Sequence, residues 1–153
     1  MLNTNICFLL RDGKILLAMK KRGFGAGKWN GTGGKCDGDE SPLLSAVREV
    51  REEICVDVQA EHLRHAALIR FHFPHKPDWD QECSVYVTEH FEGEPKETEE
   101  MRPEWFALND IPYHAMWSDD IHWLPKVLEG NFVDARFVFD EESNVLEQHV
   151  VCK

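Results

Sequence analysis

The sequence lacks any long uninterrupted run of apolar residues. Its first apolar stretch, residues 6–10, ends at Arg11 and Asp12. A membrane-spanning helix needs about 20 apolar residues, and a secretory leader needs an apolar core of about 7–15 residues, so this stretch fits neither. No later run in the chain approaches the length of a membrane span. We therefore expect a cytoplasmic protein with no membrane partner.

Basic residues are few compared with acidic ones. The chain has 17 lysines and arginines against 28 aspartates and glutamates, which gives a formal net charge of −11. Such a surface repels polyanions, so nucleic acids are not expected as partners. A small anionic ligand is still compatible with this charge where bound cations neutralise the ligand locally.

Paired cysteine motifs and helical zinc motifs are also absent. The five cysteines are scattered and odd in number, with no C-x-x-C pair, and the eight histidines lack i, i+4 spacing. These spacings argue against a disulfide framework and against structural zinc. We expect free, buried thiols instead.

The chain is predicted to form one α+β domain, residues 1–153, because it contains no repeat and no linker. It is expected to be a monomer. Two apolar runs separated by Arg-Asp-Gly predict a hairpin, and residues 23–38, with seven of the ten glycines, predict a long loop. Helices are predicted at 42–54, with Ser41 as N-cap, and at 120–128. Extended segments are predicted at 5–10, 14–19, 56–58, 66–73, 83–88 and 104–108, with a terminal hairpin of 132–139 and 145–151.

The first predicted helix carries a dense group of acids. Glu49, Glu52 and Glu53 fall within an arc of about 100°, away from the apolar stripe that contains Val50 and Ile54. Like charges this close destabilise a helix, and hard divalent cations such as Mg²⁺ would balance them. The alternative is a solvated acidic face, which is common on surface helices.

The neighbouring residues favour the metal site. Residues 34–56 place Gly34, Glu40, Arg48-Glu49-Val50 and Glu52-Glu53 at the spacing G-x5-E-x7-R-E-U-x-E-E-x-G-U, which resembles the Nudix box. Cys55 departs from the pattern, at a helix end where glycine favours a left-handed cap. The resemblance implies an α+β Nudix fold, with a mixed sheet and a smaller sheet sandwiched between helices. It also implies Mg²⁺-dependent hydrolysis of a nucleoside diphosphate linked to another group, with Mn²⁺ as an alternative cation.

The resemblance assigns roles to individual residues. It implies that Glu49, Glu52 and Glu53 are the catalytic carboxylates, with Glu53 or Glu52 as general base. Arg48 is expected to orient these glutamates, and Glu40 is expected to anchor the turn between loop and helix. The implied metal ligands are Glu49, Glu52, Glu53, the main-chain carbonyl of Gly33, and Glu100.

A second resemblance covers more of the chain. Residues 19–31, 100–103, 105–106 and 116–120 resemble the MutT-like branch of the family, whose members hydrolyse oxidised purine nucleoside triphosphates. This resemblance implies 8-oxo-dGTP or 2-oxo-dATP as the small-molecule partner. The products would be the monophosphate and pyrophosphate, and the role would be sanitation of the nucleotide pool against DNA damage.

Three kinds of side chain would recognise the base. Trp117 offers a face for stacking, Asn30 offers a donor and an acceptor, and one of Asp119 and Asp120 could stay protonated so that the pair both donates and accepts. The substrate-binding residues expected in full are Asn5, Lys20, Phe24, Asn30, Thr32, Gly33, Gly34, Lys35, Phe71, Trp117, Ser118, Asp119 and Asp120.

Several alternatives stay open at this stage. Trp117 could be a core aromatic residue, and Asp119 with Asp120 could cap the helix that follows. The substrate could be another nucleotide, such as an unmodified or methylated purine triphosphate or a nucleotide sugar, or the domain could bind a nucleotide without turnover. A phosphate loop is rejected, because residues 23–28 are one residue short and Trp29 stands where Ser or Thr would bind Mg²⁺.

Overall fold

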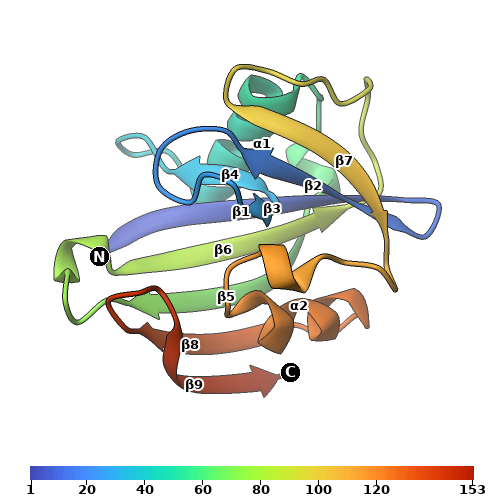
Figure 1. Ribbon diagram of the computed structural model, residues 1–153. Coiled ribbons are helices and arrows are strands. Elements are labelled where there is room, and N and C mark those ends of the chain that lie inside the picture. Colours follow the sequence, from blue (N-terminus) through green and yellow to red (C-terminus); the bar gives the residue numbers. More distant parts are fainter.

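The computed structural model describes residues 1–153, which form one extended sheet with two α-helices packed on it (Figure 1). The strands are β1 (Leu2–Arg11), β2 (Lys14–Lys20), β3 (Trp29–Asn30), β4 (Thr32–Lys35), β5 (Arg64–His72), β6 (Gln81–Thr88), β7 (Met101–Ala107), β8 (Val133–Phe139) and β9 (Val145–Cys152). The helices are α1 (Pro42–Ile54) and α2 (Asp120–Leu128), with short 3-10 turns η1 (Ala60–His62), η2 (Pro77–Trp79) and η3 (Tyr113–Ala115). No helix is long and apolar enough to cross a membrane.

Strand β1 connects two parts of the sheet. The strand order is β3-β2-β1-β6-β5-β8-β9, and β4 and β7 pair with β1 and β2 outside this path. Strand β1 pairs with β4 through residues 4–7 and with β2 through residues 9–11, while β6 runs parallel to it along its other side. The predicted mixed sheet is confirmed. The smaller sheet, β7-β2-β3, is hydrogen-bonded to the main one through β1 and is therefore continuous with it.

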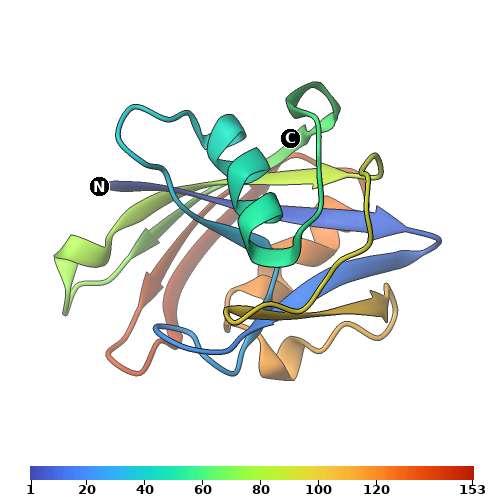
Figure 2. The same ribbon diagram turned by 90° about the horizontal axis from the view of Figure 1, so that it is seen from above.

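The two helices cover opposite faces of this sheet. Phe8 of β1 belongs to the larger core with Trp123 of α2, whereas Leu9 belongs to a second core with Val50 and Ile54 of α1. Adjacent residues of a strand point to opposite faces, so the two cores lie on either side of β1. Figure 2 shows α1 lying across β1 and β6. The predicted sandwich between helices is thus confirmed.

Both helices begin and end where the sequence predicts. Ser41 caps α1 as expected, because its hydroxyl accepts the Leu44 N–H at 3.2 Å. Both predicted hairpins form, and β6 and β7 begin two and three residues earlier than predicted. Residues 56–58 form only an isolated bridge, from Asp57 to Glu92.

The expected loop at residues 23–38 is partly wrong, because it contains β3 and β4. Glycine here serves close packing: a Cβ at Gly33 would lie 2.0 Å from the Asn5 carbonyl oxygen across the β1–β4 ladder. The glycine content of this segment therefore reflects strand pairing as well as turns.

The expectation of buried thiols holds for two of the five cysteines. Cys7 and Cys83 are buried, and burial raises the pKa of each thiol to about 12. Cys55 and Cys152 are exposed and Cys36 is partly exposed, because they lie at a helix end, a sheet edge and a loop.

Cys55 closes α1 in a left-handed conformation, with φ of 62°, and its N–H donates to the Arg51 carbonyl at 3.0 Å. The chain therefore keeps the cap that glycine favours and tolerates a cysteine there. A left-handed conformation costs an L-residue about 1–2 kcal/mol, and glycine avoids this cost. Glycine also has more conformational freedom in the unfolded chain, which offsets about 0.4–1 kcal/mol of that advantage.

We expect Cys55→Gly to raise the free energy of unfolding by about 0.5–1 kcal/mol. Chemical denaturation of both proteins measures the difference. Cys55→Ala is the matched control, since it removes the thiol but retains the Cβ, and it should bring no gain. Equal stabilities of the glycine and alanine variants would show that the backbone conformation is not the cause.

Candidate active site

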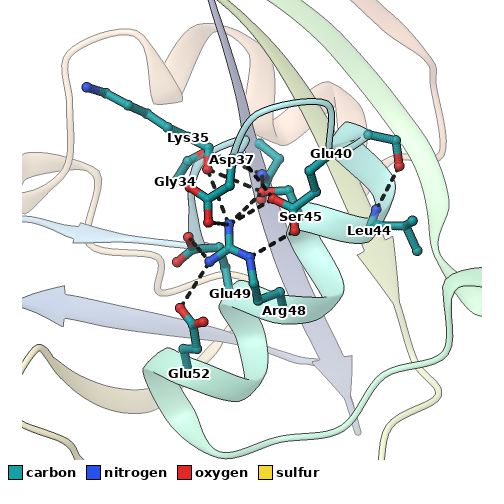
Figure 3. A network of polar contacts seen from close by, with 11 residues as sticks. Gly34, Lys35, Asp37, Glu40, Leu44, Ser45, Arg48, Glu49 and Glu52 are labelled. Atoms are coloured by element: carbon teal, nitrogen blue, oxygen red, sulfur yellow. Dashed lines mark hydrogen bonds and ion pairs between the residues drawn. The ribbon is translucent and has the colours of Figure 1, made fainter.

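The guanidinium of Arg48 organises the loop between β4 and α1 (Figure 3). It donates to both oxygens of Glu40, from Nε and Nη2, at 2.9 Å each. Its Nη1 donates to Glu49 and to Glu52 at 3.0 Å each. These hydrogen bonds hold the pKa of Glu40 at about 2. The predicted orienting role of Arg48 therefore agrees with the geometry.

Glu40 anchors the turn, as expected. Its Oε1 also accepts the Asp37 N–H at 3.0 Å, so one carboxylate joins the loop backbone to the helix side chain. A bidentate arginine–carboxylate pair fixes direction as well as distance. The consequence is that Arg48 presents its remaining N–H groups to Glu49 and Glu52.

Glu53 is the most buried acid of the helix. Its Oε1 accepts the Gly33 N–H at 2.8 Å, which connects α1 to β4. Burial, together with the neighbouring charges of Glu49 and Glu100, raises its pKa to about 8 despite that hydrogen bond. Gly34 leaves room for Glu49, because a Cβ at Gly34 would lie 3.1 Å from a carboxylate oxygen of Glu49.

These acids suit a hard divalent cation in their donor chemistry. Glu49, Glu53 and Glu100 share one cavity wall, and burial raises the pKa of Glu49 as well, so a cation would relieve their mutual repulsion. No three Asp, Glu, His or Cys side chains converge as a closed metal cage. Mg²⁺ is commonly held by one or two carboxylates together with substrate phosphates, so this open arrangement fits it.

The acids face a cavity of about 560 Å³. This is a volume typical of small-molecule sites. Of the predicted site residues, the following line it: Asn5, Lys20, Phe24, Asn30, Gly33, Gly34, Lys35, Glu49, Glu53, Phe71, Glu100, Trp117, Asp119 and Asp120.

Three predicted residues lie elsewhere. The Thr32 hydroxyl turns to the Cys7 carbonyl at 3.3 Å, and the Ser118 hydroxyl donates to the Ser143 carbonyl at 3.2 Å. Glu52 is exposed and paired with Arg48, outside the cavity wall. In each case a neighbouring residue lines the cavity. Successive side chains of strand β4 and of helix α1 point in different directions, which turns Thr32 and Glu52 away from it. Ser118 lies in the turn before α2.

Aromatic side chains form the other end of the cavity. Phe24 lies 5.0 Å from Trp117 and 4.6 Å from Trp79, measured between ring centroids. Phe73 and Phe139, whose rings stack at 5.2 Å, also line the wall and were not predicted. Phe73 could have been found from the sequence, since it follows Phe71 at the two-residue period of one strand face.

Lys28 is a further cavity residue that the sequence did not reveal. Its ammonium lies 5.3 Å from the Trp117 ring centroid, within the range of a cation–π interaction. Lys28 belongs to the glycine-rich segment that was rejected as a phosphate loop. Gly25 in the same segment lies against Trp117, where an added Cβ would come within 3.2 Å of the indole.

Two adjacent buried aspartates lie beside the aromatic residues. Asp119 accepts the Trp123 indole N–H at 2.7 Å and makes no side-chain cap to α2, so the capping alternative is wrong. Burial raises the pKa of both carboxyls, and the charge of Asp119 raises that of Asp120 further. Both shifts favour the protonated form of the carboxyl, most strongly for Asp120, and Oδ2 of Asp120 is buried without a partner in the fold.

The amide of Asn5 connects the cavity to the acidic helix. Its Nδ2 donates to the Ser45 hydroxyl at 2.7 Å and to the Gly34 carbonyl at 3.2 Å. Its Oδ1 is buried without a partner. Asn30, by contrast, accepts the Gly31 N–H at 2.8 Å and keeps its amide nitrogen available on the wall. The cavity thus offers a small number of polar groups among aromatic ones.

Asp120→Asn should stabilise the fold increasingly as the pH rises. The raised pKa means that folded Asp120 holds a proton that the unfolded chain releases above about pH 4, so the wild-type chain loses stability between the unfolded and the folded pKa. Asparagine cannot ionise and has nearly the same size as aspartate. Calorimetric melting temperatures across this pH range measure the difference.

The control for this prediction is Asp78→Asn, because Asp78 is exposed. Its effect on the melting temperature should not grow with pH. A constant difference between Asp120→Asn and the wild type at every pH would contradict the protonated state of Asp120.

Comparison with known proteins agrees with this geometry. The oxidized purine nucleoside triphosphate hydrolases of Danio rerio and Mus musculus are both 38% identical to the chain, over 93% and 92% of it and over 89% and 88% of their own lengths. The solved MutT protein of Bacillus halodurans shares the fold, with a TM-score of 0.82, 19% identity, and coverage of 98% of this chain and 97% of that one. The NUDIX domain description matches residues 1–127. The chain is a member of the Nudix hydrolase family.

Proposed function

We propose that this enzyme hydrolyses oxidised purine nucleoside triphosphates, of the 8-oxo-dGTP and 2-oxo-dATP type, to the monophosphate and pyrophosphate. The observation that carries the proposal is a single cavity lined by two chemically different groups of side chains. Aromatic rings and an aspartate pair form one group, and acidic residues of α1 form the other. The names of the two relatives that are 38% identical over most of the chain support the same substrate class.

The base would bind at the aromatic end. Trp117 supplies a flat face for stacking, which contributes about 1–3 kcal/mol per base in comparable sites. With one carboxyl of the Asp119–Asp120 pair protonated, the pair would present both a donor and an acceptor. Exchange of the proton within the pair would match the different hydrogen-bonding edges of two oxidised purines. Asn30 adds a free amide N–H.

The triphosphate would extend toward α1. Lys20 and Lys35 line that path and offset the phosphate charge. Glu49, Glu53 and Glu100, with the Gly33 carbonyl, would hold Mg²⁺, or Mn²⁺ as the alternative. When bound, such a cation neutralises phosphate oxygens and lowers the pKa of a water molecule.

Glu53 is the better of the two candidates for general base. It lies on the cavity wall, and its hydrogen bond to the Gly33 N–H fixes the direction of its carboxyl group. Glu52 is exposed and held by Arg48. Sanitation of the nucleotide pool would then be the cellular role, and the cytoplasm its location.

The substrate proposal predicts a ranking of kcat/KM values. We expect 8-oxo-dGTP and 2-oxo-dATP to exceed unmodified dGTP by about tenfold or more, because buried polar groups of a site reject an analogue that cannot pair with them. Pyrophosphate release measured on the three triphosphates gives the values. Equal values for all three would remove the sanitising role and leave the hydrolase assignment intact. No turnover of any triphosphate would favour a binding module.

The catalytic proposal predicts unequal effects at adjacent residues. Glu53→Gln should lower kcat by about 10²–10⁴, the usual contribution of a general base. Glu52→Gln is the matched control, since it makes the same chemical change one residue away, and it should lower kcat much less. Steady-state kinetics at saturating Mg²⁺ measure both. A larger loss for Glu52→Gln would transfer the role to Glu52.

A further inference from the structure

Strand β9 is an open edge of the sheet. It is the last strand in the order and pairs only with β8. In Figure 1 it forms the lower border of the sheet, with no segment beyond it. Residues 146–149 are all exposed, and Leu146 retains 61% of its accessible surface. An edge strand of this kind presents unpaired N–H and C=O groups to which another strand can bind.

The register of β9 on β8 shows which backbone groups point outward. The Lys153 N–H donates to the Phe132 carbonyl at 2.8 Å, which continues the register in which His149 lies opposite Arg136. In an antiparallel pair, successive residues alternate between bonding the neighbour and pointing away from it. Odd-numbered residues, including His149, therefore bond β8. Gln148 and Val150 point their N–H and C=O groups away from it.

The sequence around Gln148 is self-complementary for antiparallel pairing. Glu147 and His149 flank it on a regular stretch of β9 that ends at a bulge at Leu146, where the register with β8 shifts by one residue. A second copy related by a two-fold axis at Gln148 would place Glu147 opposite His149 on both sides of the axis. An acid opposite a base across strands is stabilising, whereas like charges directly opposite are destabilising.

We propose that β9 pairs antiparallel with β9 of a second copy of this chain, with Gln148 on the two-fold axis. The two Gln148 residues exchange N–H···O=C hydrogen bonds, and Glu147 lies opposite His149 of the partner subunit. This symmetric dimer replaces the monomer expected from the sequence. The interface is short, so the dimer forms in a concentration-dependent manner. The inference rests on the sheet edge alone and is independent of the proposed substrate.

A two-fold axis at Val150 is the main competing register. It would set Glu147 opposite Lys153 of the partner subunit, but the Lys153 ammonium already lies 3.3 Å from Asp134 of its own chain. It would also set His149 opposite a valine. The Gln148 register matches acid with base better, and the two registers differ in their response to charge reversal.

Sedimentation velocity over a range of protein concentrations tests the dimer. We expect the wild-type chain to shift from monomer to dimer and Gln148→Pro to stay monomeric, because proline removes the outward N–H at the axis. Its melting temperature should stay close to that of the wild type, since this N–H makes no bond to β8. Gln148→Thr retains the N–H and serves as the control that should still dimerise.

The outcomes separate cleanly. A wild-type chain that stays monomeric up to its solubility limit would overturn the proposal. A Gln148→Pro chain that dimerises as well as the wild type would overturn it too. Should the proline variant unfold, Glu147→Lys provides the second test, because it alters only an exposed side chain.

Charge reversal identifies the register. Glu147→Lys should weaken dimerisation about tenfold, because on both sides of the axis it replaces the acid opposite His149 of the partner subunit with a second basic residue. Adding His149→Glu should restore the wild-type dissociation constant. In the Val150 register the double variant would still place the introduced lysine opposite Lys153 of the partner subunit. Dimerisation of the double variant would then stay weak, which would refute the axis at Gln148.

Discussion

Several carboxylates gather where the loop after β4 enters α1, and their mutual repulsion has to be balanced within the fold. Arg48 provides much of that balance, with both Glu40 oxygens on one side of its guanidinium and Glu49 and Glu52 on the other. The pairing joins loop to helix and sets the direction of Glu49. Because a guanidinium is planar and always charged, lysine could not make this set of bonds. The acidic wall of the cavity therefore depends on one cation of the chain itself.

Strand β1 connects the acidic residues of α1 to the aromatic residues of the cavity. It pairs with β4, β2 and β6, and it carries side chains into both cores, so the acidic helix and the aromatic cluster are held on one framework. Asn5 of β1 bonds both Ser45 of α1 and Gly34 of β4. A substrate that stacks at Trp117 and places its phosphates near Glu53 would span elements far apart in sequence.

The open edge at β9 contrasts with the enclosed cavity. Strand β8 is covered on both sides by pairing partners, and Phe139 at its end forms part of the cavity wall. Strand β9 covers β8 but nothing covers β9 in turn. Natural sheets commonly carry charged side chains on such edges, which disfavour pairing with other strands. In the proposed dimer, Glu147 would lie opposite His149 of the partner subunit. The same strand thus completes the fold of one chain and offers a surface to another.

The sequence by itself determined both helices, the Ser41 cap, the hairpins and the spacing that identifies the acidic segment, because these depend on local periodicity and short-range hydrogen bonds. Only the tertiary structure decided that β3 and β4 lie within the glycine-rich segment, since Gly33 is needed for approach to Asn5, a residue remote in the chain. It also decided that Glu53 faces the cavity and Glu52 does not, that Phe139 and Lys28 lie near Trp117, and that Trp79 contacts Phe24. Those outcomes depend on long-range packing, in which each side chain's direction is set by the element it lies against rather than by its neighbours in sequence.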